Sequence, residues 1–175
     1  MVRPGQFWRV AWEVQSEAGN TYIAHGAQTY CIVLEGRFRP SDRFAPIQII
    51  PVHQAGVVYA SYGDWIFEDP GIAGDHLLAE VWNHSCALVG HLNKYFGRIS
   101  KSALDQMRML VEITDQGLSI PPDLLIASAV QEHCCTDEET ILGFRKKEAE
   151  MTRHFYAPTC DIPSPDGPEH DDQEV

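Results

Sequence analysis

A series of short β-prone runs, separated by turn residues, constrains the fold of this chain more than any other feature. Residues 30–34 (YCIVL) are rich in β-formers and end just before Gly36, and residues 47–52 (IQIIPV) have the same character. Residues 64–67 form a further run, which the strong turn signal DPG at 69–71 closes. Strands this short and this closely spaced favour a small, strongly bent β-barrel.

The amino-terminal segment 5–14 (GQFWRVAWEV) alternates between two faces and predicts a first strand with one strongly buried face. The apolar side chains on that face are Trp8, Val10, Trp12 and Val14. Residues 76–81 and 85–88 are also predicted as strands, although their apolar spacing fits a helix as well. These segments supply the remaining strands of the expected barrel.

Three helices are expected in the second half of the chain. Ser100 is a suitable N-cap before apolar residues at helical spacing, and Gly117 stands where a C-terminal cap is expected. The apolar side of this helix consists of Ala103, Leu104, Met107, Leu110 and Val111. A second helix is predicted to begin after the Pro-Pro pair at 121–122 and to run to about residue 131. The sequence TDEE at 136–139 fits a capping box with Thr as the N-cap, and predicts a third helix to about residue 154.

These patterns divide the chain into three parts. Residues 1–117 form the barrel and its closing helix, residues 118–157 an appended helical segment, and residues 158–175 an acidic, proline-punctuated tail that we expect to be disordered. The tail holds six acids and no Lys or Arg: Asp161, Asp166, Glu169, Asp171, Asp172 and Glu174. Half of the net charge of -12 therefore lies in the tail.

The net charge and the cysteines limit the functional class and the cellular compartment expected for this chain. A net charge of -12 repels a polyanion at long range, which excludes a protein that coats nucleic acid but allows a local basic groove. Five cysteines without framework spacing predict reduced thiols and a cytoplasmic location. The opening of the chain lacks the apolar region of a signal peptide, and no apolar run approaches the roughly 20 residues of a membrane span, so no membrane partner is expected.

No metal or cofactor is expected from the sequence. His133, Cys134 and Cys135, together with His154 and Cys160, have the residue types of zinc ligands but not the paired Cys-x-x-Cys spacing. The glycines mark turns, and no glycine-rich phosphate loop is present.

Several segments in the first two thirds of the chain resemble the MazF/PemK family of toxin ribonucleases. Residues 4–10 (PGQFWRV) are similar to the family's opening strand. Residues 79–83 (AEVWN), then 97–100 (GRIS) and the helix 103–112, are similar to its late strands, its turn and its closing helix. The runs at 30–34 and 49–53 occur in the order of the family's second and third core strands, so the resemblance covers about residues 2–116.

The resemblance implies an α+β, mainly β fold: an SH3-like small barrel of the MazF/PemK/CcdB type with a C-terminal helix. It also implies a homodimer that cleaves single-stranded RNA without metal in a toxin-antitoxin system. Such cleavage needs groups that activate the ribose 2′-hydroxyl, protonate the leaving oxygen and neutralise the phosphate.

The sequence departs from the family at two catalytic positions. Where the family has an Arg-Pro pair before the second core strand, residues 28–30 read QTY, so the phosphate-binding arginine is missing. Where the family has Thr or Ser after the third strand, this chain has His53, which can act as acid or base or can be a plain strand-end residue. Arg43 is the candidate to replace the missing catalytic arginine.

Four further residues are candidates for RNA binding. Arg37 and Arg39 share the loop of Arg43 and can contact phosphates, or can be ordinary solvated side chains. Trp65 can stack on a base or belong to the core, and Asn83 can join a site or close a turn.

Two functions from different classes fit these features. One is an endoribonuclease toxin with an altered active site, whose groove is covered by an antitoxin or by the chain's own tail at 161–175. The other is a catalytically inactive, dimeric interaction module of the same fold; a related toxin that binds a protein target such as gyrase is a third reading.

Overall fold

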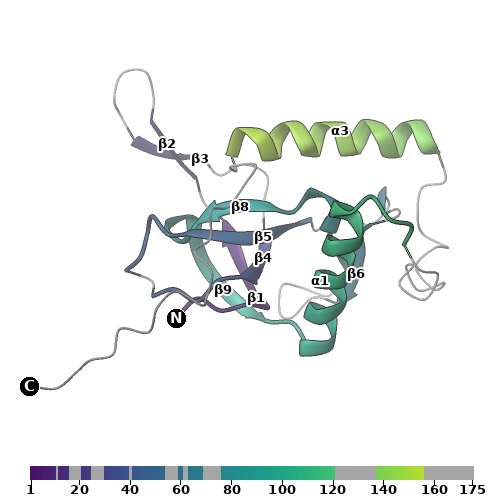
Figure 1. The fold of residues 1–175 in the computed structure, drawn as a ribbon. Helices are drawn as coiled ribbons and strands as arrows, with labels where there is room; N and C mark the ends of the chain where they lie inside the picture. Colours follow the sequence, from purple (N-terminus) through teal and green to yellow (C-terminus); the bar gives the residue numbers. More distant parts are fainter. Residues whose placement is uncertain are drawn as a thin grey trace, which may run out of the picture.

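The computed structural model describes residues 1–10, 12–15, 21–24, 30–39, 41–53, 59–60, 63–68, 76–120 and 137–155. In these residues every strand pairing is antiparallel, and two α-helices accompany the strands (Figure 1). The predicted α+β, mainly β class is therefore confirmed. Neither of the described helices is long and apolar enough to cross a membrane.

Seven strands form one bent sheet in the order β6-β7-β5-β4-β1-β9, with β8 paired to β5 beside this path. Their bounds are β1 Gln6–Val10, β4 Tyr30–Glu35, β5 Pro46–His53, β6 Trp65–Glu68, β7 His76–Ala79, β8 Ser85–Leu88 and β9 Leu92–Arg98. Two short 3-10 turns, η2 (Val81–Asn83) and η3 (Val89–His91), flank β8. Within the described residues β6 and β9 do not pair, so the sheet is not closed into a barrel.

The centre of the sheet is buried on both faces. Ile32 and Leu34 of β4 belong to the core cluster beneath the first helix, whereas Cys31 and Val33 belong to a second cluster on the opposite face. A strand covered on both sides needs a continuous apolar run rather than an alternating one. The predictions of core strands at 30–34 and 47–52 are confirmed by β4 and β5.

The predicted single strand over 5–14 is wrong. The segment forms β1 and a separate strand β2 (Trp12–Gln15), which pairs with β3 (Thr21–Ala24) in a two-stranded sheet. The expected single buried face is also wrong for β1, because Phe7 is fully buried in one core cluster while Val10 is buried in the other. Register shifts between β1 and β9 bend the strand and allow both faces to be covered.

Helix α1 (Lys101–Asp115) confirms the most strongly signalled helix. The Ser100 hydroxyl oxygen accepts a hydrogen bond from the Ala103 amide at 3.1 Å, which caps the first turn. Gly117 adopts φ +64 just after the last turn, as a C-terminal glycine cap requires. The buried side chains of this helix are Leu104, Met107, Leu110 and Val111.

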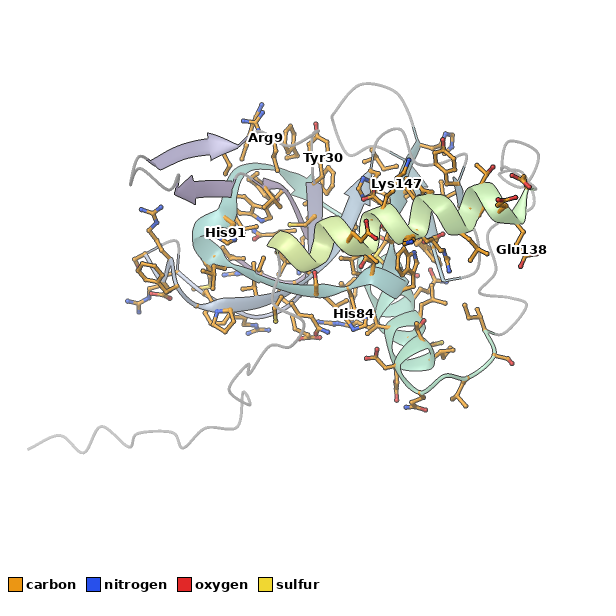
Figure 2. The ribbon with its side chains drawn as sticks, turned by 90° about the horizontal axis from the view of Figure 1, so that it is seen from above. Arg9, Tyr30, His84, His91, Glu138 and Lys147 are labelled. Carbon is orange, nitrogen blue, oxygen red and sulfur yellow. The ribbon has the colours of Figure 1, made fainter. Side chains whose placement is uncertain are left out.

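Helix α3 (Glu138–Phe155) agrees with the third predicted helix. Asp137 provides the cap, since its carboxylate accepts from the Thr140 amide at 3.0 Å; the predicted N-cap, Thr136, lies outside the described residues. The predicted helix at 122–131 and the acidic tail also lie outside them. Figures 1 and 2 show α3 lying across the sheet, with Glu138 at its start.

Two features were not expected from the sequence. The edge strand β9 was not predicted, because its side chains are mostly exposed or half-buried and leave no apolar run. The prediction that all cysteines are free thiols is wrong for Cys86, which is disulfide-bonded, while Cys31 is free and buried. Cysteine spacing in the sequence does not reveal which thiols the fold brings together.

Candidate functional site

The strand pairing at the end of β5 brings a histidine and a glutamate side by side. His53 is the last residue of β5 and pairs with Leu78 of β7. Two residues later in the chain, the Glu80 amide donates to the Pro51 carbonyl at 3.0 Å, which holds the start of η2 against β5. The Glu80 side chain therefore lies beside the imidazole of His53.

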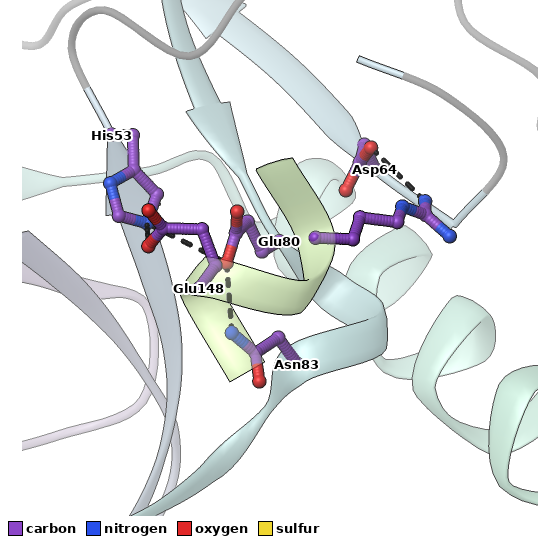
Figure 3. A network of polar contacts seen from close by, with 6 residues as sticks. His53, Asp64, Glu80, Asn83 and Glu148 are labelled. Carbon is purple, nitrogen blue, oxygen red and sulfur yellow. Dashed lines mark hydrogen bonds and ion pairs between the residues drawn. The ribbon is translucent and has the colours of Figure 1, made fainter. Parts of the chain in front are cut away.

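Helix α3 adds a second carboxylate to the same place. Nε2 of His53 lies 3.0 Å from Oε2 of Glu148 and 3.5 Å from Oε2 of Glu80 (Figure 3). Glu80 is fully buried, and the His53 and Glu148 side chains are only 15% and 12% exposed. Three elements distant in the sequence thus converge on one cluster, which we call the His53 cluster: His53, Glu80 and Glu148.

Asn83 fixes the orientation of the buried carboxylate. Its Nδ2 donates to Oε2 of Glu80 at 2.9 Å, while Oε1 of Glu80 has no hydrogen-bond partner in the described part of the chain. An ionised carboxylate with so little solvation is costly unless a positive charge lies close by. His53 is the group that can supply this charge.

The electrostatics of the cluster keep His53 protonated. Burial by itself lowers the pKa of His53, but ion pairing with Glu148 and Glu80 outweighs it and raises the pKa from 6.5 to about 10. At neutral pH the imidazole is therefore positively charged, so it can donate a proton or pair with an anion.

Helix α3 covers the cluster through several further contacts. Phe144 stacks on Tyr59 with ring centroids 4.4 Å apart and lies edge-on to His53 at 6.1 Å. Arg145 pairs with the buried Asp64 at 3.3 Å and places its guanidinium 4.8 Å from the centroid of the Trp82 ring. These contacts hold α3 over His53, so this structure shows the cluster in a covered form.

The cluster also has the donor atoms of a metal site. One ligand atom each from His53, Glu80 and Glu148 lies within 4.8 Å of the other two. An imidazole nitrogen and two carboxylate oxygens suit divalent cations such as Zn²⁺ or Mn²⁺. A test of any reaction at this cluster therefore needs a chelator.

The structure does not bring the two predicted catalytic residues together. Arg43 precedes β5 and His53 ends it, so an eight-residue strand, roughly 20 Å long when extended, lies between them. Of the RNA-binding candidates, Asn83 reaches the His53 cluster, and Trp65 on β6 is half-buried against the core. Arg39 is exposed in the segment between β4 and β5, and its amide donates to the Asp42 carboxylate at 2.9 Å.

Two members of the cluster were missed from the sequence. Glu80 stands alone in an apolar stretch, HLLAEVW, and a single acid among buried residues was the available signal. Glu148 gives no such signal, because α3 carries several other acids and only the tertiary contact distinguishes it.

Comparisons with known proteins find similarity among solved structures. No family model matches the chain, and no curated protein matches it in sequence. Among solved structures, the chain is similar to a Mycobacterial endoribonuclease solved in complex with its cognate antitoxin, with a TM-score of 0.46 and 11% sequence identity over 69% of this chain and 100% of the other. Since one fold hosts many unrelated activities, the function of this chain has to be argued from its own residues.

Proposed function

We propose that this chain is a toxin-family protein of the MazF/PemK type that cleaves single-stranded RNA without metal, with His53 as the proton donor. One observation carries the proposal: at the end of β5, where the sequence resemblance puts a catalytic side chain, a protonated imidazole lies between two carboxylates. An acid and a base within reach of each other are what transesterification of RNA requires. On this proposal residues 1–117 have an SH3-like architecture, as an open barrel with its closing helix, and the protein is a cytoplasmic homodimer.

The proposed reaction uses the ribose 2′-hydroxyl as the nucleophile. A carboxylate of the cluster, Glu80, accepts the 2′-hydroxyl proton as the oxygen attacks phosphorus, and His53 gives a proton to the departing 5′-oxygen. The products are a 2′,3′-cyclic phosphate and a free 5′-hydroxyl. The positive charge of His53 also stabilises the phosphate, which would compensate for the missing Arg-Pro arginine.

The substrate phosphate has to take the place of Glu148. In this structure Glu148 pairs with His53 at 3.0 Å, the position that an anionic oxygen of RNA would need. We propose that the appended segment 118–157 keeps the enzyme closed through α3, and that RNA or a binding partner displaces it. An antitoxin or the chain's own acidic tail can act on the same groove.

The direct test is an incubation of the full chain with single-stranded RNA in the presence of EDTA, followed by analysis of the product ends. We expect cyclic-phosphate ends, their loss in His53→Ala, and faster cleavage by Glu148→Gln, because α3 is then held less tightly. Glu150→Gln is the matched control, since Glu150 is exposed on the same helix. Absence of cleavage by both the wild type and Glu148→Gln would refute the ribonuclease proposal.

A specific observation favours a second function, the inactive interaction module. The His53 side chain is only 15% exposed and both of its carboxylate partners lie in contact, so the cluster can also serve only to fasten α3 to the sheet. In that case His53→Ala weakens the contact between α3 and the sheet, and neither the wild type nor the variant cleaves RNA. The chain would then act through its surfaces, as a dimer or on another protein.

A further inference from the structure

A second region of the molecule gathers positively charged side chains around a cavity. A cavity of about 390 Å³ lies where the chain start, the segment after β4 and the first turns of α1 meet. Five cations line it: Arg3, Arg37, Arg98, Lys101 and Arg108. The chain has only 13 Lys and Arg residues and a net charge of -12, so this concentration of positive charge runs against the composition of the protein. We call this cavity the basic pocket.

One of these cations is held in place, and the other four form no ion pair within the described part of the chain. Arg108 pairs with Glu35 at 2.7 Å and donates to the Leu34 carbonyl at 3.0 Å, which holds its guanidinium at the wall. The remaining four make no ion pair with any residue that the structure describes: Arg3, Arg37, Arg98 and Lys101. Asp105 is the single acid that lines the pocket. These four side chains are exposed, and like charges around one cavity raise the local positive potential, which attracts an anion.

Two features of the backbone at the basic pocket also favour the binding of an anion. Helix α1 begins at Lys101, so the positive end of a 15-residue helix faces this region. Gly5 has φ +79, and a Cβ there would lie 3.4 Å from both Nε of Arg98 and Cδ2 of Leu104. The positive φ therefore favours glycine at this position, where the chain passes beside Arg98 and α1.

We propose that the basic pocket binds a phosphate group on a ligand of nucleotide size. Arginine pairs with phosphate oxygens through two parallel hydrogen bonds, and several unpaired cations match a doubly charged phosphate better than a single carboxylate. The volume of about 390 Å³ lies within the range of small-ligand sites. If the proposed function holds, this phosphate belongs to the RNA strand.

The basic pocket is separate from the His53 cluster. Tyr30 at the start of β4 pairs with Val52, next to His53, whereas Glu35 at the end of β4 pairs with Arg108 of the pocket. The two sites therefore lie at opposite ends of β4. Binding at the pocket can be measured without any cleavage at His53.

The test is a binding titration of the full chain with AMP, adenosine, inorganic phosphate and a single-stranded RNA hexamer. We expect AMP and the hexamer to bind, phosphate to compete with both, and adenosine not to bind. Arg37→Ala and Arg98→Ala should each weaken binding about fivefold or more, and Arg37→Lys should weaken it less, because it keeps the charge but loses the bidentate geometry. Lys146→Ala removes one exposed cation on α3 and should change affinity less than twofold. Circular dichroism of each variant checks that it folds.

The outcomes separate this proposal from the ribonuclease proposal. Loss of hexamer binding in the pocket variants, with binding retained and cleavage lost in His53→Ala, supports both. Binding of AMP without binding of the hexamer confirms the phosphate site and assigns it to a free nucleotide. Equal affinity of AMP and adenosine, or pocket variants that bind like Lys146→Ala, would overturn the proposal whatever the result of the cleavage assay.

Discussion

Replacement of Glu148 by Gln tests whether the ion pair between His53 and Glu148 holds α3 on the sheet. The substitution keeps the size of the side chain and removes the charge that lies 3.0 Å from Nε2 of His53. His53 keeps Glu80 at 3.5 Å, so its pKa should fall but stay above the ordinary value. The variant therefore reports how much of the stability of the fold depends on a protonated His53.

The expected loss in the free energy of unfolding follows from the pKa of His53. A rise from 6.5 to about 10 corresponds to roughly 5 kcal/mol of preference for the protonated form in the folded state, at about 1.4 kcal/mol per unit. Because the pKa is higher in the folded than in the unfolded chain, this contribution is complete below about pH 6.5 and disappears as the pH rises through about 10. The burial of Glu80 offsets part of it, so we expect Glu148→Gln to lower the free energy of unfolding by about 2 kcal/mol at pH 6.

The assay is urea unfolding at pH 6, 7.5 and 9, followed by tryptophan fluorescence, because Trp82 lies beneath Arg145 of α3. The difference in stability between wild type and Glu148→Gln should be smaller at pH 9 than at pH 6 and should vanish only above about pH 10, because folded His53 loses its proton at a lower pH in the variant than in the wild type. NMR of the imidazole ring should show His53 protonated at pH 8 in the wild type. A constant difference at all three pH values, or a His53 that titrates between pH 6 and 7, would refute the claim that an ion pair with protonated His53 holds α3 on the sheet. Glu150→Gln should follow the wild type.

Three further substitutions test individual parts of the fold by the same unfolding measurement. Asn83→Ala removes the hydrogen bond to buried Glu80 and should cost about 1–3 kcal/mol; no loss would mean that water replaces the amide. Ser100→Ala removes the cap of α1 and should cost about 1 kcal/mol, with Ser102→Ala, at an exposed position in the same helix, as the control. Met107→Ala truncates a fully buried side chain and should cost about 2–5 kcal/mol, whereas exposed Met109→Ala should cost less than about 0.5 kcal/mol.

The parts of the fold that could be predicted are those in which local sequence and burial agree. β4 and β5 are buried on both faces, so their apolar runs stand out, and α1 has both a polar cap and an apolar side. β9 lies at an edge of the sheet with exposed side chains, so nothing in its composition separates it from a loop. β1 and β2 pair in different sheets, and the alternating sequence of the segment does not indicate this change of partner.

The site could be predicted only in part, for a similar reason. His53 was proposed from its place after a core strand, which depends on nearby residues in the chain. Glu148 is 95 residues further on, and only the packing of α3 brings it to the imidazole. Arg43 shows the converse: it is near His53 in the sequence, but the extended strand β5 lies between the two residues.

An RNA substrate that contacts both the His53 cluster and the basic pocket has to span the distance between these two sites. β4 has six residues, so the two sites lie roughly 17 Å or more apart, and a strand has to run along the sheet to reach from one to the other. A contact so far from the reacting phosphate holds the substrate and the transition state equally, so its loss should raise KM and leave kcat unchanged. Arg37→Ala should therefore slow cleavage of a long RNA at low concentration and leave cleavage of a dinucleotide unaffected. If the variant lowered kcat, or impaired both substrates equally, the pocket would not be a remote binding site for the RNA that His53 cleaves.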